Sequence, residues 1–202
     1  MENLSFKVMD VHDIGFPDDM FDLVVSYTVA HFWLDPAKAM RELKRVTKDG
    51  GQIVTAGLRD FGSAPRYPEC PNWETVWRAW SRHYEAKRSA FLERGEKSKR
   101  FFWDLYAGRK CVEWYSKAGI KDVMLTLKVE DWLYPTSEDM ASEAADFLNL
   151  DEKIEWGAIE EAVDEGFLEQ AVVEKARVET KAWKANPYAF HYHPVFMAVG
   201  RV

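Results

Sequence analysis

The first sixty residues combine short apolar runs with one amphipathic segment. The apolar runs cover residues 6–9, 21–26 and 52–58, and each has the length of a strand. Between the last two, Asp35 and Pro36 fit the N-cap and first position of a helix whose apolar residues recur at helical spacing. A strand, a helix and a strand in this order predict an α/β fold with parallel strands. The continuous apolar run at 21–26 predicts a strand covered on both faces.

The rest of the chain is mostly amphipathic and predicts helices with two further strands. We expect a single domain over residues 1–202, with helical insertions at about 60–120 and 135–186. The expected helices lie at 71–95, 101–106, 111–118, 136–148, 154–163 and 168–183, and the expected strands at 123–130 and 193–202.

Charge and composition exclude several classes of partner and location for this protein. The net charge of −7 gives a field of the wrong sign for nucleic acid, so we expect no nucleic-acid partner. No apolar stretch reaches the roughly 20 residues that a membrane helix needs, and the N-terminus lacks the pattern of a secretory signal. Two cysteines, Cys70 and Cys111, suit a reducing compartment, so we expect a cytoplasmic protein. His191 and His193 have no third ligand at a recognised spacing, so no metal is predicted.

A series of short motifs fills the first 51 residues in a fixed order. They are Phe6-Lys7-Val8-Met9-Asp10-Val11, Phe16-Pro17-Asp18-Asp19, Phe21-Asp22-Leu23-Val24-Val25-Ser26, His31, Asp35-Pro36, Arg41-Glu42, Arg45-Val46 and Lys48-Asp49-Gly50-Gly51. This series resembles class I S-adenosylmethionine-dependent methyltransferases, and most closely their small-molecule branch of the quinone-biosynthesis type. The resemblance implies a Rossmann-like methyltransferase sheet and methyl transfer from S-adenosylmethionine to a small, largely apolar acceptor.

The resemblance also implies which residues contact the cofactor. Asp10 corresponds to the acidic residue that approaches the adenine amino group, and Val11 supplies the neighbouring backbone N–H. Ser26, Tyr27 and Thr28 correspond to the loop beside the methionine portion of the cofactor and the methyl acceptor.

Aromatic and imidazole side chains are the candidates for the acceptor side. His31 is a candidate general base, because imidazole titrates near neutral pH, and the alternative is a histidine packed under the following helix. Trp33, Trp77 and Trp103 are candidates for an apolar acceptor pocket, although aromatic residues at helical spacing also form cores.

One departure from the family pattern concerns the cofactor. Family members carry a first strand with a glycine-rich turn and a second strand that ends in an acidic residue, and this sequence has neither. We therefore expect an N-terminally truncated sheet and weakened S-adenosylmethionine binding. Loss of three or four hydrogen bonds at about 1 kcal/mol each corresponds to roughly 10²–10³ in affinity.

The departure leaves two other functions open. The chain could be a non-catalytic binding or regulatory partner of a complete methyltransferase, or an enzyme that works without the cofactor.

The missing first strand also leaves one edge of the strand at 21–26 open. This edge needs a cover, because open strand edges aggregate. We expect either that residues 6–9 shift beside this strand or that a second copy pairs there to form a homodimer.

Overall fold

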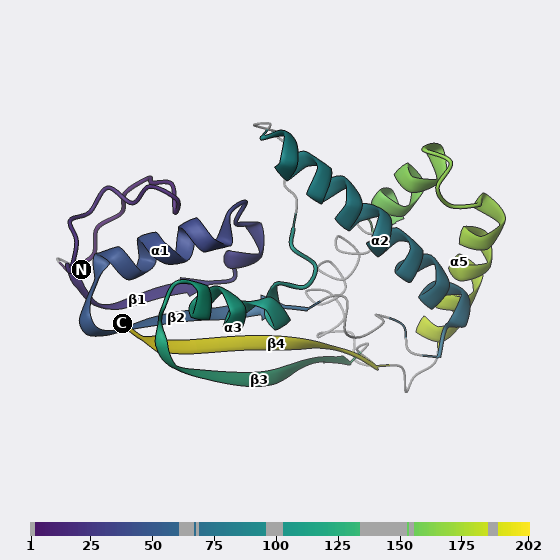
Figure 1. Cartoon of the computed structure of the whole chain (residues 1–202). Coiled ribbons are helices and arrows are strands. Elements are labelled where there is room, and N and C mark those ends of the chain that lie inside the picture. Colours follow the sequence, from purple (N-terminus) through teal and green to yellow (C-terminus); the bar gives the residue numbers. More distant parts are fainter. Residues whose placement is uncertain are drawn as a thin grey trace. The chain divides into compact units, whose positions relative to one another are not determined.

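The computed structural model describes residues 3–60, 67, 69–95, 103–133, 153, 156–185 and 190–202. The chain forms two compact units (Figure 1). The first contains Met1–Asp60, Lys99–Lys128 and Pro194–Val202, and the second contains Phe61–Ser98 and Val129–His193. Both predicted insertion ranges, about 60–120 and 135–186, overlap the second unit, and residues 103–120 belong to the first.

The first unit is built around a four-stranded sheet with the order β1-β2-β4-β3. The strands are β1 (Phe21–Tyr27), β2 (Thr47–Arg59), β3 (Lys121–Leu133) and β4 (Phe190–Arg201). β1 and β2 are parallel, with Leu23 beside Gln52 and Tyr27 beside Ala56, whereas β2 and β4 are antiparallel. The predicted α/β class and the parallel pairing of 21–26 with 52–58 are therefore confirmed.

Helix α1 (Pro36–Val46) connects the two parallel strands. The Asp35 carboxylate accepts a hydrogen bond of 2.8 Å from the Lys38 N–H, as expected of an N-cap. The helix ends at Val46, because β2 begins at once at Thr47. Its buried side chains are Ala39, Met40, Leu43 and Val46.

The predicted strand at residues 6–9 is wrong. None of these residues is in a strand, and Phe6 is 87% exposed while Val8 is fully exposed. An extended segment becomes a strand only where a neighbour pairs its backbone groups. The four-stranded sheet of the described residues does not include this segment, so it has not moved beside β1.

The loop that follows this segment is held on α1 by two charged side chains. The Glu42 carboxylate accepts from the Ile14 N–H at 2.9 Å. The Arg45 guanidinium donates to the Ile14 and Phe16 carbonyl oxygens at 2.6 and 2.8 Å, and also to the Asp18 carboxylate at 2.7 Å. Hydrogen bonds from Arg45 lower the pKa of Glu42 to about 2, so the carboxylate stays charged at neutral pH.

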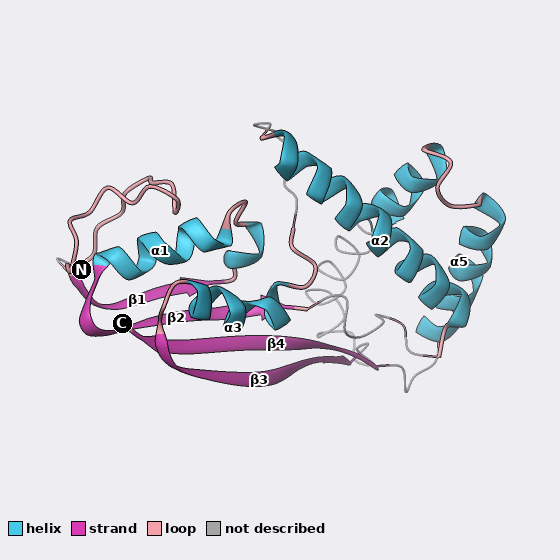
Figure 2. Ribbon diagram, viewed as in Figure 1, coloured by secondary structure: helices cyan, strands magenta, loops and turns pink. Residues whose placement is uncertain are grey.

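Helix α3 (Ala107–Lys117) lies with α1 on one side of the sheet (Figure 2). Its Tyr115 hydroxyl is buried, within 3.0 Å of the Ala198 carbonyl oxygen and 3.2 Å of the Ile53 carbonyl oxygen. A Cβ atom at Gly200 would lie 2.5 Å from Ile120, so the helix side packs closely against β4. The predicted helix at 101–106 is wrong for residues 103–106, which form a loop and a turn before α3.

The sheet presents an apolar face beyond the reach of α1 and α3. Leu23, Val25 and Tyr27 of β1 are 52%, 58% and 66% exposed. The prediction that this strand is covered on both faces is therefore wrong. A run of apolar residues indicates burial only where the fold supplies two layers.

The second unit contains α2 (Pro71–Arg94), helical residues 156–164 and α5 (Gln170–Lys184). The Glu179 carboxylate of α5 accepts from the Asn72 and Trp73 N–H groups at 2.8 and 3.0 Å, which satisfies the first turn of α2. The predicted helix at 71–95 is confirmed, and Gly95, in the left-handed conformation, follows the last residue of α2. The predicted helix at 136–148 lies outside the described residues.

Among the described residues, no helix combines the length and the apolar character that crossing a membrane requires.

Removal of the Tyr115 hydroxyl tests the packing of α3 on the sheet. We expect Tyr115→Phe to lower the free energy of unfolding by about 1–2 kcal/mol, because buried carbonyl oxygens lose a donor. Tyr27→Phe is the matched control, since its side chain is exposed. Urea denaturation measures both, and an equal effect of the two substitutions would contradict this account.

Candidate functional site

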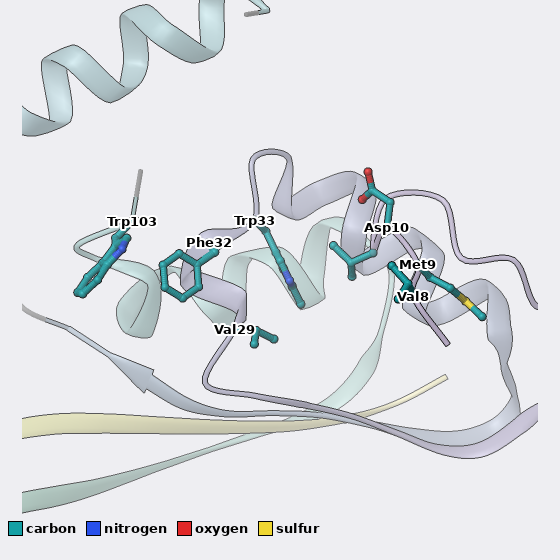
Figure 3. A pocket seen from close by; sticks show the side chains of 8 residues that line it. Val8, Met9, Asp10, Val29, Phe32, Trp33 and Trp103 are labelled. Carbon is teal, nitrogen blue, oxygen red and sulfur yellow. The ribbon is translucent and has the colours of Figure 1, made fainter. Parts of the chain in front are cut away.

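A pocket of about 960 Å³ opens in the first unit. Figure 3 shows three rings along it, those of Trp103, Phe32 and Trp33, with the segment that carries Asp10 beyond Trp33. The residues that line it are Val8, Met9, Asp10, Val11, Val29, Phe32, Trp33 and Trp103. The wall is thus almost wholly apolar, with one carboxylate.

The pocket lies where β1 ends, which is the usual place for a ligand in an open α/β sheet. Thr28 follows β1 with φ of +56°, an uncommon conformation for a β-branched residue. Its N–H donates to the Ala56 carbonyl oxygen at 2.9 Å, and a Cβ atom at Gly57 would lie 2.4 Å from its methyl group. This tight crossing starts the short 3-10 helix Ala30–Phe32, which brings Val29 and Phe32 to the pocket.

The Asp10 carboxylate is the charged group of the pocket. Its Oδ1 atom accepts from the His12 N–H at 2.8 Å and lies 2.7 Å from His12 Nδ1. These two hydrogen bonds lower the pKa of Asp10 below its ordinary value. The group is therefore a carboxylate at neutral pH and can only accept hydrogen bonds.

His31 lies beside the pocket and is not one of its lining residues. The residue is 8% exposed, and its ring centre lies 4.2 Å from that of Phe32 and 5.9 Å from that of Trp103. Burial, followed by the charge of Arg59, lowers the pKa of His31 to about 4, against the opposing effect of Asp104. The imidazole is therefore neutral at pH 7, and its Nδ1 atom has no hydrogen-bond partner among the described residues.

The structure brings four of the predicted site residues together. Asp10, Val11, Trp33 and Trp103 line the pocket.

The other predicted site residues lie elsewhere. Ser26 is buried in β1, Tyr27 is exposed at its end, and Thr28 forms the crossing with Gly57. Trp77 belongs to α2 of the second unit, where its ring centre lies 5.9 Å from that of Trp73 and 4.8 Å from that of Trp80.

Sequence reasoning missed four apolar lining residues: Val8, Met9, Val29 and Phe32. A signal existed for two of them, because Val29 and Phe32 are three residues apart and share one side of a 3-10 turn. No signal existed for Val8 and Met9, since their pattern is that of a buried strand.

Metal and thiol chemistry find little support in the described part of the chain. Its His, Cys, Asp and Glu side chains form no group of three or more that could hold a metal ion. The side chains of His191 and His193 lie outside that part. Cys70 and Cys111 are free and buried, and burial raises the pKa of each thiol to about 11, so neither is a thiolate at pH 7.

The N-terminal part of the chain is similar to known methyltransferases. Residues 1–55 match the model of a family described as methyltransferase domain. An uncharacterized methyltransferase of Schizosaccharomyces pombe is 39% identical over 69 residues, which are 34% of this chain and 24% of that protein. The chloroplastic 2-methyl-6-phytyl-1,4-hydroquinone methyltransferase of Spinacia oleracea is 31% identical over 120 residues, which are 57% of this chain and 25% of that protein.

The chain is also similar, at low sequence identity, to a solved structure. A SAM-dependent methyltransferase from Methanosarcina mazei is 13% identical with a TM-score of 0.45, and the alignment covers 98% of this chain and 66% of that one. The chain spans about a quarter of the length of the two curated relatives. The resemblance to class I S-adenosylmethionine-dependent methyltransferases is confirmed, and it is carried by residues 1–55.

The buried imidazole of His31 predicts a pH-dependent stability. Because its pKa is about 4 in the folded chain and 6.5 as a free side chain, the unfolded chain binds the extra proton. Stability is therefore lost as the pH falls from about 6.5 towards 4. We expect the loss between pH 7 and pH 5 to be about 1–2 kcal/mol smaller in His31→Gln, after allowance for partial solvent screening.

Urea denaturation at the two pH values measures this difference. Equal losses of unfolding free energy in His31→Gln and the unaltered chain would show that the imidazole does not titrate in this way.

Proposed function

We propose that this chain takes part in S-adenosylmethionine-dependent methyl transfer to a small, largely apolar acceptor. The single observation that carries the proposal is an ionised carboxylate, Asp10, on the wall of an otherwise apolar pocket at the end of a parallel strand. The carboxylate lies within the residues that match the methyltransferase domain model. Support therefore comes from the geometry and from the family match together.

The pocket residues fit the nucleoside part of the cofactor. An adenine amino group is a hydrogen-bond donor, and Asp10 Oδ2 has no hydrogen-bond partner among the described residues. The Val11 N–H is likewise unpaired within that part of the chain, so it can donate to a ring nitrogen. Val8 and Trp33 supply apolar surface for a flat base.

When the cofactor is bound, its sulfonium group supplies an activated methyl group to a nucleophile. The protein then contributes alignment and the exclusion of water, which supply much of the acceleration in such displacements. Phe32, Trp103 and Val29 offer an apolar wall for this purpose.

For the acceptor we propose an apolar molecule with a weakly acidic hydroxyl, thiol or carbon nucleophile. The spinach relative is named for a hydroquinone, which belongs to this chemical range. We propose His31, whose ring lies beside the lining residues Phe32 and Trp103, as the proton acceptor, since its imidazole is neutral at pH 7. Its low pKa makes it a weak base, so the proposal favours acceptors that lose their proton late in the reaction.

Asp10 gives the sharpest test of cofactor binding. We expect the unaltered chain to bind S-adenosylhomocysteine saturably and Asp10→Asn to bind it about tenfold more weakly, because the amide lacks the charge that strengthens the hydrogen bond. Asp13→Asn is the matched control, since it removes one charge from the same loop.

Isothermal titration calorimetry measures the three affinities. Absence of heat with the unaltered chain at millimolar ligand would contradict the proposed function. It would favour the alternative role of a non-catalytic partner of a complete methyltransferase, or of an enzyme without this cofactor.

We further propose that the free edge of β1 pairs with a second copy. β1 lies at the end of the sheet, and its backbone groups pair with β2 on one side only among the described residues. An antiparallel pair centred on Val24 places Phe21 opposite Tyr27 and Asp22 opposite Ser26. No like charges face each other in this register, which favours the pairing.

Light scattering tests the homodimer. We expect a mass of twice 23.5 kDa for the unaltered chain and a shift to the monomer in Val25→Lys, because a charged side chain on an edge strand opposes pairing. Val178→Lys is the control, since Val178 is exposed on α5. A monomeric unaltered chain at micromolar concentration would contradict the dimer.

A further inference from the structure

The imidazole of His12 is hydrogen-bonded at both nitrogens. Nδ1 lies 2.7 Å from Asp10 Oδ1, and Nε2 lies 3.2 Å from the backbone nitrogen of Asp35. The Asp35 backbone nitrogen can only donate, so Nε2 must accept. The proton of the neutral imidazole is therefore on Nδ1, which donates to the Asp10 carboxylate. The His12 side chain is 18% exposed, and the neighbouring groups fix its tautomer.

This arrangement determines which oxygen of Asp10 is free. Oδ1 receives two donors from His12, the backbone N–H at 2.8 Å and Nδ1–H at 2.7 Å. Two donors on one oxygen restrict rotation of the carboxylate. The second oxygen, Oδ2, is left to accept from a ligand, and the Asp10 side chain is 68% exposed.

His12 also connects this carboxylate to a rigid element. Asp35 is the N-cap of α1, and its carboxylate accepts from the Lys38 N–H at 2.8 Å. The residues before His12 have no strand beside them in the described sheet. The Asp35 N–H therefore fixes the tautomer of His12, and the Nδ1–H bond fixes the orientation of the Asp10 carboxylate.

We propose that His12 is a positioning residue that aims Asp10 at the exocyclic amino group of the bound nucleoside. This role rests on the proposed function, because it requires a nucleoside in the pocket. It goes beyond the family resemblance, which concerns Asp10 and Val11 and gives no role to residue 12.

Two conservative substitutions separate the two hydrogen bonds of His12. In His12→Asn, the side-chain amide nitrogen replaces Nδ1 and keeps the donor to Asp10. In His12→Gln, the amide oxygen replaces Nε2 and keeps the acceptor for Asp35. His12→Ala removes both, and every variant is made in the full chain.

We expect calorimetry with S-adenosylhomocysteine to show rescue by the Asn variant. His12→Ala and His12→Gln should bind about tenfold more weakly than the unaltered chain, and His12→Asn within about threefold of it. In an Asp10→Asn background, His12→Ala should have no further effect, since the two residues act as one unit. A merely structural role would instead follow thermal stability, which is measured on the same samples.

The tautomer supplies a readout that needs no ligand. Long-range ¹H–¹⁵N spectra of the unaltered chain should show the proton of the neutral His12 ring on Nδ1. A proton on Nε2, or equal affinities of His12→Ala and the unaltered chain alongside a loss in Asp10→Asn, would overturn the positioning role alone. No binding by the unaltered chain would overturn the proposed function and this role with it.

Discussion

The guanidinium of Arg45 is the interaction on which the candidate site depends. The segment that carries Asp10 has no strand beside it in the described sheet, so its place is set by side chains of α1. Arg45 binds the carbonyl oxygens of Ile14 and Phe16, and Glu42 binds the Ile14 N–H. Charge-assisted bonds of this kind are stronger than neutral ones and hold a loop without a ladder of backbone pairs. The helix that joins the parallel strands thus also supports one wall of the pocket.

Different interactions hold the two walls of the pocket, residues 29–33 and residues 8–11, in place. The wall at 29–33 follows from the sheet, because Thr28 and Gly57 force a sharp turn where β1 ends. The wall at 8–11 follows from polar contacts on α1. The other residues that line the pocket are apolar, so Asp10 is its one charged group. Burial beside this pocket lowers the pKa of His31 and keeps its imidazole neutral. A mostly apolar site with one fixed charge suits a ligand that is mostly apolar and carries a donor at one end.

The sequence predicted the parallel unit well, because Asp35 and Pro36 mark the helix start and the apolar runs have strand length. It failed at residues 6–9, since a pattern of side chains cannot say whether a neighbouring strand exists. For the site, the family resemblance located Asp10, whereas spacing could not tell that Trp77 belongs to the other unit. His12 was missed because its role depends on Asp35, 23 residues further along the chain.

The antiparallel pairing of β2 with β4 has a consequence for how the protein is made. Ile53 lies beside Gly200, so β2 cannot complete its pairing until β4, far later in the chain, has been synthesised. Loop closure over such a sequence distance slows folding and prolongs the exposure of apolar strands. On the ribosome, the central strand of the first unit therefore remains half-paired while the whole second unit is translated. Until β4 is synthesised, one edge of β2 has unpaired backbone groups.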